Sequence, residues 1–131
     1  MRKVAELRRY AADVGARVQN EVARFEADED LHDLAAFHLL LALQNAADLA
    51  FHLVADRGLD VPGSQREAYE ALARAGAIDH DLAAALGEAA GLRNRLAHQY
   101  GTVDWRRLHA EAPRHLEALQ RFAVRVAEIT R

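Results

Sequence analysis

The sequence of 131 residues contains no cysteine. Disulfide bonds, thiolate nucleophiles and thiolate metal ligands are therefore excluded. Proline occurs only twice and aromatic residues make up 6% of the chain, whereas alanine and leucine supply most of its apolar side chains. Sandwiches and barrels depend on β-branched and aromatic residues, while alanine and leucine are strong helix formers. These scarcities predict an all-α protein.

Positive charge is also in short supply, because the net charge is −3 at neutral pH. A protein that coats nucleic acid through phosphate attraction is strongly basic, so RNA or DNA binding here would need a local patch. Arg9, Arg106 and Arg107 are candidates for such a patch. The N-terminus lacks the apolar core of a signal peptide, and no apolar run approaches the roughly 20 residues that span a bilayer. We expect a cytoplasmic protein that does not enter a membrane.

Apolar residues recur at steps of three and four in five segments, the periodicity of amphipathic helices. We expect one domain, residues 1–131, folded as an up-and-down bundle of four long helices and one short helix. The expected long helices are Lys3 to Phe25, Glu29 to Arg57, His80 to Gln99 and Trp105 to Thr130, and the short helix lies between Ser64 and Gly76. The expected N-caps are Asp28 or Asp30, Ser64, Asp79 and Asp104. Pro113 is expected to kink or split the last helix.

The second expected helix is apolar nearly all round, which indicates a central helix or one that also meets a second protomer. One strip of it is polar: His38, Asn45, Asp48 and His52. Asp48 and His52 have a spacing that can ligate a metal ion, but the carboxylate–histidine pair is not repeated on a second helix. We therefore expect no metal and no cofactor. We expect the strip to face Arg93 on the helix from His80 to Gln99.

The segment from Arg93 to Tyr100 is the feature that most needs explanation. At about 100° per residue, Arg93 falls on the apolar stripe of its helix, and Tyr100 would fall there too if the helix runs that far. His98 lies roughly 140° away from Arg93 and shares a face with Asn94. A helix that needed only a core would place leucine at position 93, because a buried guanidinium is costly unless it is paired or reserved for an anion.

Arg93 and His98 carry the parts needed for metal-free RNA cleavage. A guanidinium binds phosphate through its planar fork, and an imidazole can give or take a proton near neutral pH. Because the two side chains point to different faces, they can meet at one phosphate if the helix end unwinds, if the long arginine curls round, or if a second protomer completes a shared cleft. We favour the shared cleft. Structural roles are the alternative: Arg93 could pair with Asp48 inside the bundle, and His98 could complement the helix dipole. Trp105 is expected in the core.

These residues resemble a known family. The pattern Arg93-Asn94-x-Leu-Ala-His98-x-Tyr100 is similar to the Arg-x4-His-x-Tyr signature of HepT-like proteins in the HEPN superfamily. The resemblance extends over about Asp30 to Ile129. It includes the alanine- and leucine-rich helix with Asp48, the Pro62-Gly63-Ser64 turn, the Gly76 to Asp79 link, and Gly91-Leu92.

The resemblance implies an endoribonuclease toxin whose partner is an MntA-like nucleotidyltransferase antitoxin. It implies a HEPN-type bundle that forms a homodimer, with the two motifs lining a cleft at the interface and RNA cleaved without metal. By position, Arg93 would contact phosphate, His98 would be the general acid/base, and Asn94 and Asp48 would support them. Tyr100 would accept AMP groups from the antitoxin. The alternative is a non-catalytic helical module that dimerises and binds a nucleotidyltransferase.

Overall fold

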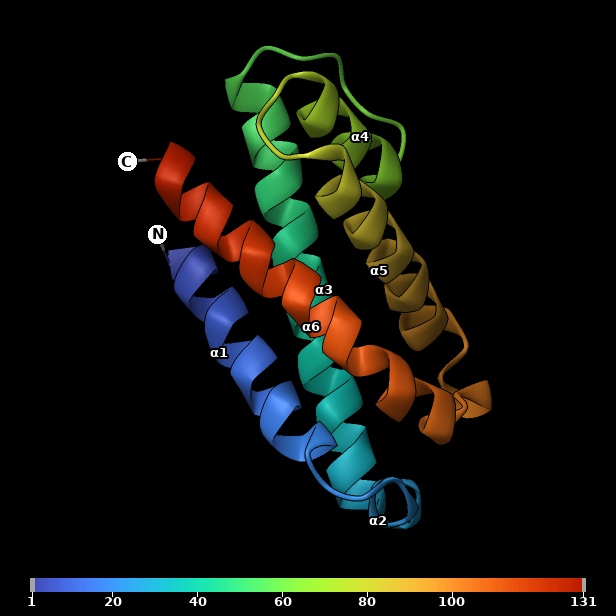
Figure 1. The fold of residues 1–131 in the computed structure, drawn as a ribbon. Helices are drawn as coiled ribbons and strands as arrows, with labels where there is room; N and C mark the ends of the chain where they lie inside the picture. The colour runs from blue at the N-terminus through green and yellow to red at the C-terminus, as the bar shows by residue number, and fades with distance from the viewer. Residues whose placement is uncertain (1, 131) are drawn as a thin grey trace.

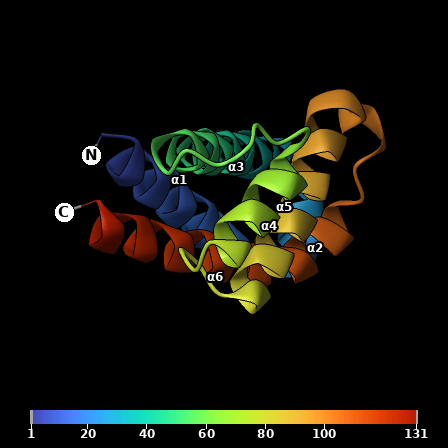
Figure 2. The same cartoon turned by 90° about the horizontal axis from the view of Figure 1, so that it is seen from above.

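A computed structural model describes residues 2–130 as a helical bundle (Figure 1). The helices are α1 (Arg2–Val18), α2 (Val22–Ala27), α3 (Glu29–Asp56), α4 (Gln65–Arg74), α5 (His80–His98), the 3₁₀ turn η1 (Tyr100–Thr102) and α6 (Trp105–Ile129). The described residues contain no strand, so the all-α prediction is confirmed. The long helices run alternately up and down, and the start of α1 lies beside the end of α6 in both views (Figures 1 and 2).

Side-chain caps fix where the helices begin. Four of the expected caps accept a backbone N–H two or three residues into the helix: Asp28 from Leu31, Ser64 from Glu67, Asp79 from Leu82 and Asp104 from Arg107. Each bond satisfies a donor that the first turn would otherwise leave unpaired. The capping assignments from the sequence are therefore confirmed, with Asp28 and not Asp30 capping α3.

The first expected helix is shorter than predicted. It was expected to continue to Phe25, but α1 ends at Val18 and a separate six-residue helix, α2, follows. The Asn20 side chain donates to the Arg17 carbonyl at 2.9 Å, which satisfies one of the free acceptors at the end of α1. The break turns the chain across the end of the bundle and leaves Phe25 fully buried. The expected split at Pro113 is also absent, because α6 is continuous.

Helix α3 is the centre of the bundle. It packs against α1, α4, α5 and α6, and its buried side chains belong to the one hydrophobic cluster that joins the long helices. By length and composition α3 could also cross a membrane, contrary to the expectation from the sequence. The core helix of a bundle meets the same criterion, and the packing on several sides explains why α3 is apolar nearly all round.

The polar strip of α3 faces α1, so the prediction that it faces Arg93 is wrong. Its contacts with α1 are His38–Asp13 (3.6 Å), Asn45–Glu6 (3.5 Å) and Asp48–Lys3 (3.4 Å). The remaining member, His52, pairs with Asp56 on α3 itself at 3.3 Å. Among residues 2–130, no three histidine or carboxylate side chains gather closely enough to hold a metal ion.

Candidate functional site

Arg93 lies half-buried on α5, one turn before the buried Leu96. Its Nε is buried and has no hydrogen-bond partner among the described residues. Its Nη1 donates to Oδ1 of the adjacent Asn94 at 3.3 Å. A guanidinium has five N–H donors, so this single contact leaves most of them free. The stem of Arg93 is therefore held by the bundle, as the position on the apolar stripe predicted, while no carboxylate of residues 2–130 pairs with its charge.

His98 is the last residue of α5 and is exposed. The helix ends there because Gln99 leaves the helical conformation, with φ −132° and ψ 35°. Within residues 2–130 the imidazole of His98 forms no hydrogen bond or ion pair. Asn94 shares a face with His98, but its amide oxygen accepts from Arg93, and no hydrogen bond joins Asn94 to the His98 ring within residues 2–130. Both ring nitrogens of His98 are thus free to meet a ligand.

Tyr100 does not lie on the apolar stripe, which corrects the expectation from the sequence. It belongs to the 3₁₀ turn η1 and is 42% exposed, because α5 ends two residues before it. Its hydroxyl donates a hydrogen bond to Oδ1 of Asp33, a residue of α3. Partial burial and this bond to the Asp33 carboxylate raise the pKa of the phenol well above its usual value. Tyr100 is therefore an un-ionised phenol at the surface, held by a carboxylate.

The ring of Tyr100 packs against a group of aromatic rings. Its ring packs edge-on to Trp105, with centroids 5.6 Å apart, and Trp105 stacks on the buried His32 at 3.9 Å. The prediction that Trp105 belongs to the core is confirmed in part, since it is half-buried and packs against the hydrophobic cluster. Phe25 closes the stack from the α2 side, 6.4 Å from Trp105. The turn η1 thus packs through Tyr100 against a fixed group of aromatic rings.

Apolar side chains open to solvent flank the motif. Phe37 is 54% and Leu34 is 43% exposed, and Phe51 lies further along α3 at 36%. A surface hollow borders this strip and is lined by Asp33, Ala36, Phe37, Leu40, Leu96 and Tyr100. Leu34 and Phe37 lie one turn apart on α3, so two exposed apolar side chains adjoin each other beside this hollow.

Asp48 and the candidate basic patch lie elsewhere. The structure does not pair Asp48 with Arg93, because the Asp48 carboxylate is 3.4 Å from Lys3 Nζ. Two of the three candidate arginines are bound to carboxylates, Arg106 to Glu26 at 3.1 Å and Arg107 to Glu111 at 2.7 Å. The third, Arg9, lies over the Tyr10 ring at 4.9 Å. Neutralised in this way, the arginines of α6 add little positive potential beside the motif.

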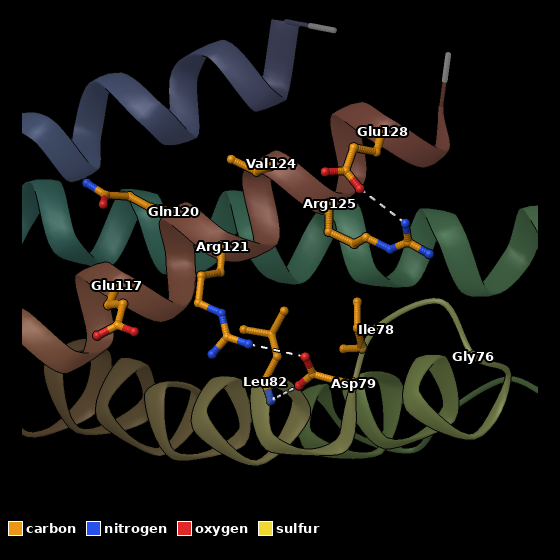
Figure 3. A pocket seen from close by; sticks show the side chains of 10 residues that line it. All are labelled: Gly76, Ile78, Asp79, Leu82, Glu117, Gln120, Arg121, Val124, Arg125 and Glu128. Carbon is orange, nitrogen blue, oxygen red and sulfur yellow. Dashed lines mark hydrogen bonds and ion pairs between the residues drawn. The ribbon is translucent and has the colours of Figure 1, made fainter.

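A hollow of about 660 Å³ lies away from the motif, between α6 and the link into α5 (Figure 3). Four of its five charged side chains pair with one another, Arg121 with Asp79 at 3.2 Å and Arg125 with Glu128 at 3.2 Å, whereas Glu117 has no partner among residues 2–130. Arg125 also donates to the carbonyl of Ala77 at 2.7 Å. This hollow lacks the unpaired arginine and histidine of the motif, so its volume does not make it the functional site.

Sequence reasoning missed Asp33 and His32. The contact between Asp33 and Tyr100 joins residues 67 positions apart, and periodicity within one helix carries no information about such a pair. A signal did exist for His32, which occupies the apolar face of α3 one turn before Ala35 and Ala36. A histidine in that place needs polar partners, and the structure supplies them in the Phe25 carbonyl and Asp33.

The up-and-down bundle with an Arg-x4-His-x-Tyr motif at the end of α5 defines a HEPN-type helical domain. Residues 4–126 match the family described as Ribonuclease HepT-like, and the chain belongs to this family.

Two relatives are similar in sequence. The mRNA nuclease HepT of Shewanella oneidensis is 26% identical over 120 residues, which cover 92% of this chain and 90% of that protein. An Archaeoglobus fulgidus protein that carries the name "Putative RNase" is 32% identical over 93 residues, which cover 71% of this chain and 70% of the relative.

Solved structures share the fold. The tri-AMPylated Shewanella oneidensis HEPN toxin in complex with the MNT antitoxin superimposes with a TM-score of 0.87, at 24% identity, over 97% of this chain and 95% of that one. A crystal structure of the toxin–antitoxin with AMP-PNP gives the same TM-score and identity, over 97% and 96% of the two chains. At this identity the likeness establishes the helical arrangement alone.

Proposed function

We propose that this protein is a metal-independent endoribonuclease toxin that cleaves RNA in a cleft formed by two copies of the chain. The observation that carries the proposal is the guanidinium of Arg93, half-buried, unpaired with any carboxylate, and five residues before the unbound imidazole of His98. Family membership supports it, since the relative from Shewanella oneidensis is named an mRNA nuclease.

The two side chains suit cleavage by the ribose 2′-hydroxyl. That oxygen attacks the adjacent phosphorus, the bond to the 5′-oxygen breaks, and the products are a 2′,3′-cyclic phosphate and a 5′-hydroxyl. His98 takes the 2′-hydroxyl proton or protonates the leaving oxygen, because its nitrogens are unoccupied. Arg93 neutralises the charge that develops on the phosphoryl oxygens, and Asn94 holds the guanidinium in place. Asp48 joins α3 to α1 through its ion pair with Lys3, and we assign it no part in this step.

A second protomer completes the site in this proposal. In-line attack benefits from one histidine as base and another as acid, and one chain supplies a single motif histidine at the end of α5. Phe37 lines the hollow beside the motif, and the exposed apolar strip of Leu34, Phe37 and Phe51 gives a second copy a surface to cover. A symmetric dimer that buries this strip places both motifs along one cleft.

The proposed protein partner is an MntA-like nucleotidyltransferase that attaches AMP to Tyr100. The phenol stands at the surface beside the motif, where a bulky and negatively charged adenylate would obstruct RNA phosphates. A structural neighbour is described as a tri-AMPylated toxin in complex with its antitoxin, which supports this assignment. We place the protein in the cytoplasm, where RNA and such a partner are both present.

A non-catalytic module is the second candidate. It is favoured by one observation: no side chain within residues 2–130 fixes the tautomer of His98. Such a module would dimerise and bind the nucleotidyltransferase without cutting RNA.

The test uses purified protein and a labelled RNA in the presence of EDTA. We expect cleavage with 2′,3′-cyclic phosphate ends, abolished by Arg93→Ala and by His98→Ala. Arg95→Ala and His80→Ala are matched controls on the same helix, both at exposed positions, and should retain cleavage. Absence of cleavage by the parent protein, together with stable capture of the nucleotidyltransferase, would establish the non-catalytic alternative.

Mixing the two inactive variants tests the composite cleft. A mixed dimer contains Arg93 from one chain and His98 from the other, so a shared cleft regains part of the activity after subunit exchange. If each chain used its own Arg93 and His98, neither chain of the mixed dimer would have both, and no activity would return.

A further inference from the structure

The Tyr100 hydroxyl is held by a carboxylate and remains open to solvent. Tyr100 is 42% exposed, and the side chain of Asp33 is 52% exposed. The phenol donates its proton directly to Asp33 Oδ1. A macromolecule that approaches this end of the bundle can therefore reach the phenolic oxygen without displacing its hydrogen-bond partner.

This contact is built by several elements. Nδ1 of the buried His32 lies 3.0 Å from the Phe25 carbonyl, which can only accept, so Nδ1 carries a proton. Its other nitrogen, Nε2, lies 3.5 Å from Asp33 Oδ1. The His32 ring is fixed by its stack on Trp105, and the same Trp105 supports the Tyr100 ring. The contacts thus form a chain of three groups held by packed rings: Tyr100 Oη contacts Asp33 Oδ1, which in turn lies near His32 Nε2.

We propose that Asp33 is the general base that activates the Tyr100 phenol for nucleotidylation, which rests on the proposed function above. In this step Tyr100 Oη attacks the α-phosphorus of a nucleoside triphosphate held by the nucleotidyltransferase. The Oη–P bond forms, and the bond between the α-phosphorus and the bridging oxygen of the β-phosphate breaks. Pyrophosphate leaves with the electron pair of that bond, and the phenolic proton passes to Asp33 Oδ1. His32 Nε2 accepts the proton from Asp33, and solvent removes it when the modified side chain moves away.

The state of the phenol explains why a base is needed. Burial and the Asp33 contact raise the pKa of Tyr100, so the free phenolate is scarce at neutral pH. A neutral phenol is a weak nucleophile, and it gains strength only as its proton leaves. The carboxylate already receives that proton in a hydrogen bond, which satisfies the geometric requirement for general base catalysis.

The experiment measures single-turnover transfer of labelled AMP to the full-length protein at a saturating concentration of the nucleotidyltransferase. Asp33→Asn keeps an oxygen acceptor but removes the basicity, and we expect it to slow transfer on the order of 100-fold. Asp30→Asn is the matched control, since Asp30 is an exposed carboxylate in the first turn of the same helix. Thermal melts confirm that both variants fold.

A chemical rescue separates a base from a mere positioning contact. Replacement of Tyr100 by 3-fluorotyrosine makes the phenol more acidic, so it needs less help from a base. If Asp33 is the base, the fluorinated phenol restores much of the rate lost in Asp33→Asn. If the variant stays slow with the fluorinated phenol, Asp33 only positions the side chain, and if Asp33→Asn transfers AMP at the parent rate, Asp33 has no part in the step. Either result overturns the proposal.

Failure of the proposed function gives a different result. Tyr100→Phe should accept no label, because it lacks the hydroxyl. If the parent protein accepts no AMP, or accepts it equally in Tyr100→Phe, then Tyr100 is not the target, and both the modification and the role of Asp33 are refuted. Labelling at Tyr100 with an unaffected Asp33→Asn variant refutes the role of Asp33 alone.

Discussion

Phe37→Asp should dissociate the proposed dimer. Phe37 is 54% exposed in one protomer and lies on the apolar strip beside the Tyr100 hollow. A phenylalanine carries on the order of 200 Å² of surface, so about 100 Å² remains for a partner to cover. At about 25 cal/mol per Å², that area is worth about 2.5 kcal/mol for each Phe37.

The symmetry of the dimer doubles the effect. Two copies of the side chain are buried in a two-fold interface, so the loss is about 5 kcal/mol and the dissociation constant should rise by roughly a thousandfold or more. Aspartate adds the cost of removing a carboxylate from water, which acts in the same direction. The change lies on an exposed position of α3, so the fold of the single protomer should persist.

Sedimentation velocity over a range of concentrations measures this shift. Val124→Asp is the matched control, because Val124 is 47% exposed on α6 and lines the hollow of Figure 3 rather than the strip. We expect the parent and the control to sediment as dimers where Phe37→Asp sediments as a monomer, and we expect RNA cleavage to fall with the dimer. A monomeric parent, or a Phe37→Asp variant that dimerises as tightly as the parent, would refute the composite cleft.

Three further predictions concern stability. Burial, with a smaller contribution from the Asp48 charge, raises the pKa of Tyr69, so the folded state keeps a proton that the unfolded chain loses above about pH 10. Stability should therefore fall as pH rises beyond 10, and urea titrations should show a smaller fall in Tyr69→Phe. Burial lowers the pKa of His115, so the unfolded chain binds more protons below about pH 6.5, and stability should decrease as the solution is acidified. His115→Gln should flatten that part of the urea profile. Gly76 has φ 77°, so Gly76→Ala should cost about 1–2 kcal/mol in chemical denaturation, whereas Gly101→Ala, which meets no atom within 4 Å, should be nearly neutral.

The local chemistry of the chain was sufficient to predict where most helices begin. Caps at Asp79 and Asp104 depend on a side chain and a backbone N–H a few residues later, so the sequence contains all the information required. The end of α1 was not predictable in the same way. The apolar pattern continues through Val18 to Phe25, and the helix breaks because Phe25 is buried against Trp105 and His109 at the far end of the chain.

The candidate site residues could be named from the sequence, but their contacts could not. Its position on the apolar stripe singled out Arg93 as a candidate, because a buried guanidinium is costly unless it is paired or reserved for an anion. The partners of these residues depend on which faces of the helices meet, and a helical wheel does not contain that information. The polar strip of α3 could face α5 or α1, and the structure shows that Asp48 pairs with Lys3 of α1. Likewise, the residue that holds Tyr100 lies on a different helix, 67 positions away.

The point at which α5 ends determines how the motif can work. Arg93 is one turn inside the helix, and its stem is fixed by packing against the bundle. His98 is at the terminus, where no described residue restrains its ring, and Tyr100 has already turned away to a carboxylate of α3. One chain therefore offers a fixed cation and an unrestrained imidazole on different faces. Proton transfer in a transition state requires the imidazole to be held, and in the proposed dimer the surface that holds it belongs to a second copy that covers Phe37.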